Sequence, residues 1–103
     1  MEEASIHVGL NHPNIVKMIG LVFQPCNYGL LLEFMENGDL YDYLQNNKVD
    51  EIEKFNFICQ VASGMKYLHS QTPPIIQGDL KIQNILISSD KQAKVFIQLT
   101  LRL

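Results

Sequence analysis

The sequence predicts an α+β fold, and three features predict it. Residues 15–24 and 28–34 are rich in β-branched and other apolar residues. They flank turn-forming residues at 25–27, a pattern typical of a β-hairpin. Apolar residues recur at spacings of three and four along residues 51–70, which indicates a helix. A polar loop over residues 77–84 lies between short apolar segments, which favours a surface connection that can carry function.

The composition indicates one globular domain and excludes several kinds of partner. The chain has 103 residues, of which 47% are hydrophobic and 18% are charged, and a chain of this length can bury a single core. Eight Lys and Arg against eleven Asp and Glu give a formal net charge of −3. We therefore expect no nucleic-acid partner and no attraction to an anionic membrane.

The sequence also predicts a cytoplasmic location. No apolar segment approaches the roughly 20 residues that span a bilayer, and the acidic start of the chain does not resemble a secretory signal. Cys26 and Cys59 lack the spacing of a zinc site or a redox pair. We expect both to be packing thiols in a reducing compartment.

The elements before the hairpin and after the loop are predicted from local patterns. Residues 2–10 are expected to include the end of a helix, because Ile6 and Leu10 lie four apart, and Pro13 ends that helix. In the tail, residues 94–103 alternate apolar and polar side chains, which predicts a strand. Two explanations of this tail stay open: cover for the hairpin, or the product of a truncated or misread coding sequence.

Two helices are predicted between the hairpin and the loop. Asp39 is placed to cap a short helix that runs through Asn46. Asp50 and Glu53 form a plausible capping box at the start of the longer helix, and the two prolines at 73–74 end it. The apolar stripe of the longer helix is expected to be the core of the chain, and its members are Ile52, Phe55, Ile58, Val61, Ala62, Met65 and Leu68.

The polar loop places a carboxylate, an ammonium and a carboxamide close together in Asp79, Lys81 and Asn84. In phosphoryl transfer, an Asp can take a proton from a hydroxyl and a Lys can neutralise growing charge. An Asn oxygen can bind magnesium. The same residue types are common in solvated loops, so the loop by itself leaves both interpretations open.

With its neighbouring motifs, the sequence resembles the protein kinase family. Residues 79–84 look like the kinase catalytic loop, residues 12–16 like the loop after the regulatory helix, and residues 31–40 like the hinge region between the two lobes. Lys81 favours a serine/threonine type, and residues 73–76 look most like the tyrosine-kinase-like group.

The resemblance implies a partial protein-kinase-like fold. It would comprise an N-lobe hairpin remnant over residues 1–32, a hinge over residues 33–38 and the start of a helical C-lobe over residues 39–96. Residues 97–103 would form a divergent tail.

The resemblance also implies roles for individual residues. Asp79 would be the catalytic base, Lys81 the contact to the γ-phosphate of ATP, and Asn84 a ligand of Mg²⁺. Glu3 matches the helix glutamate that pairs with the ATP-binding lysine. The residues implied at the nucleotide are the gatekeeper Leu32, Glu33 and Met35 through their backbone, Asp39 at the ribose, and Leu86 under the base.

The sequence departs from the family pattern at several places. It contains no G-x-G-x-x-G loop and no V-A-I-K-type lysine, and residues 97–99 read Ile-Gln-Leu where D-F-G is usual. Gln77 stands in place of a His that hydrogen-bonds nearby backbone, which puts the fine geometry of the loop in question. Gly78 stands where an Arg is common, as in members that do not depend on activation-loop phosphorylation.

Three hypotheses about function follow. The first is a protein kinase domain fragment, from a family that transfers phosphoryl groups from ATP to Ser or Thr hydroxyls of a protein substrate. These residues alone are expected to have little or no transferase activity, because catalysis also needs the missing lysine and metal carboxylate. The second is a noncatalytic, pseudokinase-like module that binds a partner such as a complete kinase. The third is a truncated product that does not fold alone.

Overall fold

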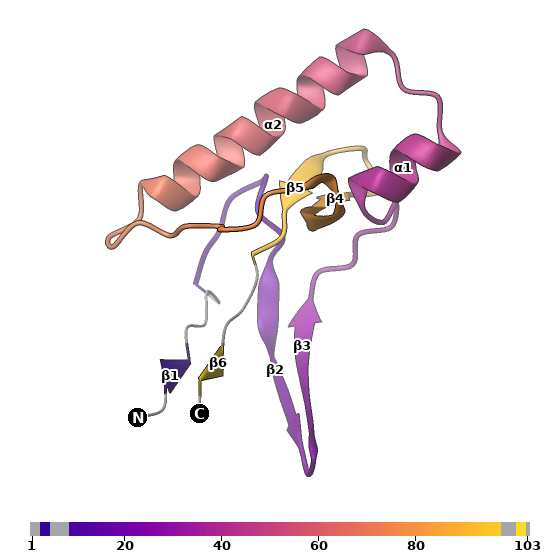
Figure 1. Ribbon diagram of the computed structural model, residues 1–103. Helices are drawn as coiled ribbons and strands as arrows, with labels where there is room; N and C mark the ends of the chain where they lie inside the picture. The colour runs from indigo at the N-terminus through magenta and orange to yellow at the C-terminus, as the bar shows by residue number, and fades with distance from the viewer. Residues whose placement is uncertain (1–2, 5–8, 98–100, 103) are drawn as a thin grey trace.

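The computed structural model describes residues 3–4, 9–97 and 101–102, and Figure 1 shows their arrangement. Strands β1 with β6, β2 with β3, and β4 with β5 form three antiparallel pairs. The predicted α+β class is confirmed. The elements are β1 (Glu3–Ala4), β2 (Met18–Gln24), β3 (Asn27–Leu32), α1 (Leu40–Asn46), α2 (Glu51–His69), the 3₁₀ turn η1 (Ile82–Asn84), β4 (Ile85–Ile87), β5 (Ala93–Val95) and β6 (Leu101–Arg102).

The predicted hairpin is present as β2 and β3. Gln24 and Asn27 are the last paired residues before the turn. Cys26 in the turn has a φ of 61°, and the hairpin extends away from both helices (Figure 1). The segment before β2 instead joins the C-terminal part of the fold, because Ile15 bridges Val95 in parallel.

Both helices begin where their capping residues predict. Asp39 Oδ1 accepts a hydrogen bond from Asp42 N at 2.8 Å, and Asp50 Oδ1 accepts one from Glu53 N at the same distance. These bonds satisfy backbone donors that the first helical turn leaves free. Neither described helix is both long and apolar enough to cross a bilayer.

The core consists of two clusters, and α2 contributes buried side chains to both. The first cluster lies between α1, α2 and the β4–β5 pair and contains Leu40, Tyr43, Phe57, Ile85, Ile87 and Ala93. The second lies at the other end of α2 and contains Ile15, Leu68, Val95 and Ile97.

The apolar stripe predicted to form the core of α2 is only partly buried. Ile52, Phe55 and Ile58 are 73%, 64% and 65% exposed, so this part of the prediction is wrong. Leu68, a member of the predicted stripe, is buried as expected and packs with Ile15 and Val95. Phe57, outside the predicted stripe, is buried against β4 and β5. Apolar spacing predicted the helix, but the position of its packing partners decides which face is buried.

A close contact between α2 and residues 14–15 connects the two clusters. Asn14 is buried and its Nδ2 donates to the carbonyl oxygen of Ala93 at 2.9 Å, while Asn14 O accepts from Val95 N at 2.8 Å. A Cβ atom at Gly64 would lie only 2.6 Å from Asn14 O. The helix therefore approaches this backbone as closely as a glycine allows.

Three further predictions need correction. Glu3 and Ala4 lie in a strand paired with β6, not in a helix; residues 2 and 5–8 of that predicted helix lie outside the described residues. The tail is not one continuous strand, since β5 ends at Val95, and residues 98–100 and 103 are likewise not described. Cys26 and Cys59 are free thiols as predicted, but both are exposed and do not pack in the core.

Candidate active site

The candidate site is the polar loop between α2 and β4. After α2 the chain reverses direction and passes beside the end of the helix, where Ile75 N donates to Leu68 O at 2.9 Å. Gln77 then enters the interior and is only 6% exposed. Gly78 follows with a φ of 80°, a conformation that side chains with a Cβ atom rarely adopt.

Four hydrogen bonds join Gln77, Asp79, Asn84 and Phe96 in a closed circuit, which we call the loop network. Gln77 Nε2 donates to Phe96 O at 2.9 Å, and Gln77 Oε1 accepts from Asp79 N at 2.7 Å. Asn84 Nδ2 donates to Asp79 O at 2.7 Å. Phe96 N donates to Asn84 O at 2.8 Å and closes the circuit.

The loop network leaves the reactive atoms of the loop accessible. The network uses only backbone atoms of Asp79, so its carboxylate is free to face a ligand. Lys81 Nζ lies 3.4 Å from Asp79 Oδ2, and both side chains are 53% exposed. An ion pair this exposed contributes little to stability. In Asn84 the network uses Nδ2, which leaves Oδ1 as the oxygen able to accept from, or coordinate, a ligand.

The candidate nucleotide residues lie along the segment that follows β3. Glu33 N donates to Lys17 O at 3.0 Å, and Gly38 N donates to Met35 O at 3.0 Å. Among the described residues, Glu33 O and Met35 N take part in no backbone hydrogen bond. One acceptor and one donor, two residues apart, are therefore available to a planar ligand with a complementary edge.

Backbone hydrogen bonds hold this segment against β4. Asn37 N donates to Ile87 O at 3.1 Å, and Ile87 N donates to Gly38 O at 2.8 Å. Asp39 forms an antiparallel bridge with Leu86. Leu86 therefore lies beside the segment, while an Asp39 oxygen is engaged as the cap of α1.

Leu32 lies close to the position where D-F-G is usual. Together with Val16, Met18, Phe96 and Ile97 it lines a small apolar pocket. Ile97 is only 7% exposed and belongs to the second core cluster. An apolar side chain thus occupies the position from which the family's metal-binding carboxylate would project.

The donor set does not fit a magnesium site. Asp79 is the one carboxylate in the loop, Asn84 Oδ1 adds a neutral oxygen, and Ile97 has no donor atom to contribute. Within the described part of the chain, no group of three or more His, Cys, Asp or Glu side chains could hold a metal ion. Mg²⁺ needs near-octahedral oxygen coordination, and protein carboxylates commonly anchor it.

Two features of the site were not foreseen from the sequence. Gln77, in place of a His, put the loop geometry in question, yet its side chain hydrogen-bonds to Phe96 O and to Asp79 N and so supports that geometry. Lys94 and Glu33 also form a half-buried ion pair at 2.8 Å that joins β5 to the segment after β3. Their separation of 61 residues left no local signal for this pair.

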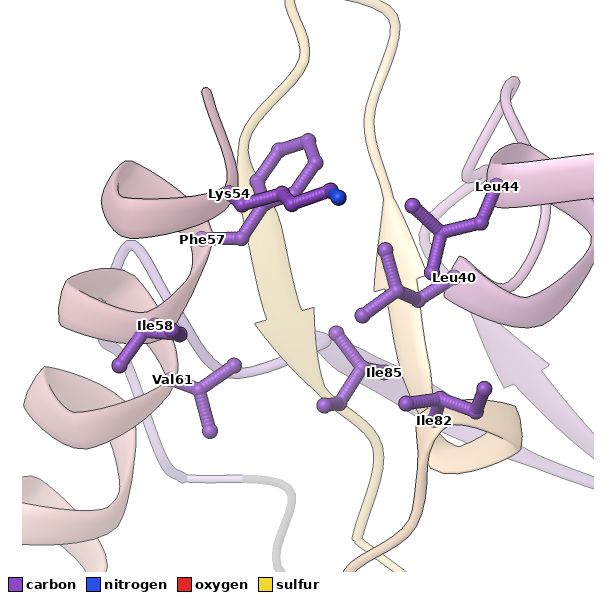
Figure 2. Close-up of a pocket in the computed structure, with 8 residues that line it drawn as sticks. All are labelled: Leu40, Leu44, Lys54, Phe57, Ile58, Val61, Ile82 and Ile85. Atoms are coloured by element: carbon purple, nitrogen blue, oxygen red, sulfur yellow. The ribbon is translucent and has the colours of Figure 1, made fainter. Parts of the chain in front are cut away.

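A larger apolar groove of about 350 Å³ lies between α1 and α2. Figure 2 shows Leu40 and Leu44 facing Phe57 and Val61 across it. Lys54 carries the one charged group in its lining. This groove therefore lacks the grouped polar side chains that phosphoryl transfer needs.

Comparison with known proteins identifies a family that covers nearly all of the chain. The family described as protein tyrosine and serine/threonine kinase matches residues 1–96. Serine/threonine-protein kinase CTR1 of Arabidopsis thaliana is 37% identical over 99 residues, covering 92% of this chain and 12% of that relative. Tyrosine-protein kinase csk-1 of Caenorhabditis elegans is 36% identical over 98 residues, covering 92% and 18%.

A third relative gives a similar picture. The probable serine/threonine-protein kinase SIS8 of Arabidopsis thaliana is 39% identical over 95 residues, covering 90% of this chain and 9% of that relative. The chain spans only 12%, 18% and 9% of the length of these three relatives.

Proposed function

The chain belongs to the protein tyrosine and serine/threonine kinase family as a fragment of its catalytic domain, and from this we propose that it supplies the hinge and the catalytic loop for phosphoryl transfer to protein hydroxyls. Members of this family act on protein substrates and generally use ATP and Mg²⁺. Lys81, two residues after Asp79, supports Ser and Thr hydroxyls as the acceptors.

The loop network is the observation that carries this proposal. Its hydrogen bonds hold Asp79 and Asn84 in a fixed relation to each other, and they leave the Asp79 carboxylate and Asn84 Oδ1 accessible. In this arrangement the Asp79 carboxylate orients the substrate hydroxyl and accepts its proton, and the Lys81 ammonium neutralises charge on the transferred group. General base catalysis of this kind contributes roughly 10² to 10⁴ in rate.

The hinge supports an adenine-binding role. Glu33 O and Met35 N can accept and donate hydrogen bonds to the edge of a purine, and Leu86 lies beside them. Leu32 would limit the depth of the site, because it lines a small apolar pocket together with Phe96 and Ile97.

These residues do not complete the reaction by themselves. The described residues do not fit a magnesium site, and the 103 residues include neither a glycine-rich loop nor the ATP-binding lysine of the family. Glu3, which the sequence matched to the helix glutamate that pairs with that lysine, lies in a strand instead. Catalysis in this family depends mostly on positioning and charge neutralisation. We expect the purified chain to transfer little or no phosphoryl group to a generic protein substrate.

The proposal is tested by grafting Gln77–Asn84 into the matching loop of an active serine/threonine kinase. The host supplies its own metal carboxylate and ATP-binding lysine. We expect the graft to retain activity and Asp79→Asn within it to lower kcat by about 10² or more. The control is Gln83→Glu, at an exposed position of the same loop. An inactive graft that still folds and binds ATP would refute the proposed role of the loop.

A second candidate, a noncatalytic pseudokinase-like module, is favoured by one observation, the buried Ile97. Such a module would bind a partner, for example a complete kinase, while its own nucleotide site stays metal-independent. The graft experiment described above separates the candidates. A graft that folds and binds ATP but stays inactive supports the noncatalytic module, whereas an active graft that loses kcat on Asp79→Asn contradicts it.

A further inference from the structure

We propose that Gln77 and Gly78 act together as the positioning device of the catalytic loop. Both residues depart from the family pattern, and the structure joins them in one local arrangement. Gln77 is a positioning residue because it acts through Asp79 and Phe96. The inference rests on the proposed function only in taking Asp79 as the base, since the geometry of the device does not depend on that role.

The oxygen and the nitrogen of the Gln77 carboxamide form hydrogen bonds to two different segments of the chain. Its Oε1 accepts from Asp79 N at 2.7 Å within the loop, and its Nε2 donates to Phe96 O at 2.9 Å at the end of β5. Gln77 is only 6% exposed. Water therefore cannot easily replace either partner, and losing one leaves a buried polar group unsatisfied.

Gly78 makes the short-range bond possible. The bond returns from Asp79 N to a side chain two residues earlier, so the chain must turn sharply between them. Gly78 makes this turn with a φ of 80°, in a region that glycine adopts without a steric penalty. A Cβ atom at Gly78 would meet nothing within 4 Å, so backbone conformation, not crowding, is what requires a glycine.

The device holds Asp79 from one side while Asn84 holds it from the other. Asp79 N is bound by Gln77, and Asp79 O is bound by Asn84 Nδ2 at 2.7 Å. With both backbone polar groups of Asp79 held, only its side-chain torsions remain free to place the carboxylate. Asn84 and Gln77 are in turn both bonded to Phe96, so one backbone position directly after β5 anchors the whole loop.

Substitutions at Gln77 and Gly78 can separate the contributions of the two hydrogen bonds that the carboxamide forms. Gln77→Met keeps a side chain of similar length and removes both bonds. Gln77→Glu keeps an acceptor for Asp79 N and loses the donor to Phe96 O. Gly78→Ala disfavours the turn without a clash, and Gly78→Asn is the conservative variant, because Asn tolerates left-handed backbone better than Ala.

The test measures amide hydrogen exchange by NMR on the complete 103-residue chain. We expect Gln77→Met and Gly78→Ala to speed exchange of the Asp79 amide by about tenfold, the effect of losing one hydrogen bond. The reference is the Val95 amide, which is bonded to Asn14 O at 2.8 Å and should change much less.

Gly78→Asn should restore part of the protection of the Asp79 amide. Gln77→Glu should shift the carbonyl ¹³C resonance of Phe96 while the Asp79 amide stays protected. Gln83→Met, at an exposed position in the same loop, should change none of these signals.

Two outcomes would overturn the inference. Unchanged Asp79 exchange in Gln77→Met and Gly78→Ala would show that the device does not hold the loop. Equal acceleration at Asp79 and Val95 would show that Gln77 serves only general stability. If Gln77→Met does not fold, Gly78→Ala and Gly78→Asn give the same comparison without altering a buried side chain. The proposed function fails separately, since an Asp79→Asn graft of unreduced activity would refute the base and leave these exchange results unaffected.

Discussion

Replacing Gly64 with alanine should destabilise the chain, although alanine is the better helix former. The added Cβ would lie 2.6 Å from Asn14 O and 3.2 Å from Ile15 Cδ1. Asn14 O cannot retreat freely, because it accepts the hydrogen bond from Val95 N. Overpacking costs about 1–3 kcal/mol, and a contact this short with a fixed backbone atom lies toward the upper end, about 2–3 kcal/mol. The gain in helix propensity offsets about 1 kcal/mol of that cost. We expect a net loss of about 1–2 kcal/mol, which for a chain of this size lowers Tm by about 5–15 °C.

The assay is thermal unfolding followed by far-UV circular dichroism. Gly20→Ala is the matched control, because a Cβ atom at Gly20 meets nothing within 4 Å, and it should change stability by no more than about 0.5 kcal/mol. A Tm for Gly64→Ala equal to or above that of the wild type would refute the close approach of α2 to Asn14. A single cooperative transition in the wild-type chain would also exclude the hypothesis that the chain does not fold alone.

Three further substitutions and one control test other parts of the structure by the same unfolding measurement. Asp39→Ala removes the cap of α1 and should cost about 1 kcal/mol; an unchanged Tm would contradict the cap. Lys94→Met leaves the half-buried Glu33 carboxylate unpaired and should cost about 1–3 kcal/mol, whereas Lys54→Met, which breaks an exposed pair, should cost less than about 1 kcal/mol. Ile97→Asp places a carboxylate among buried apolar side chains and should cost about 3 kcal/mol or more, and recovery of its Tm by Mg²⁺ would show that position 97 can still contribute to a metal site.

The features that the sequence predicted correctly are those that depend on residues close together in the chain. Asp39 and Asp50 cap their helices through bonds to residues three positions later, so the signal and the structure lie in the same few residues. The hairpin turn at 25–26 and the apolar segment at 85–87 are equally local. Each of these predictions needed no knowledge of the tertiary partner.

The predictions that failed depended on partners distant in the chain. Phe55 and Ile58 fit a helical apolar stripe, but β4 and β5 pack on a different face of α2 and leave both exposed. Cys59 was expected to pack and is exposed for a similar reason. At the N-terminus, Glu3 suited a helical turn, yet it pairs in register with Arg102, almost the full length of the chain away.

Gln77 shows how a departure from a family pattern can be misread when only the residue type is known. The sequence put the fine geometry of the loop in question because a hydrogen-bonding His was absent. The structure shows that the bonds at this position are made by a carboxamide, which has one donor and one acceptor side by side. The partners, Asp79 N and Phe96 O, are backbone atoms, and no residue type in the sequence reveals them.

The loop network and a metal site would use different atoms of the short segment at residues 96–97. The network uses the backbone N–H and C=O of Phe96, which are present whatever side chains follow. A metal site there requires a carboxylate side chain, and Ile97 instead buries its side chain in the core. The segment can therefore lose metal binding while the Asp79 loop keeps its geometry. It follows that an ordered loop at Asp79 is no measure of activity in this chain. A carboxylate at position 97 is one requirement for activity, beside the glycine-rich loop and the lysine that these 103 residues do not include.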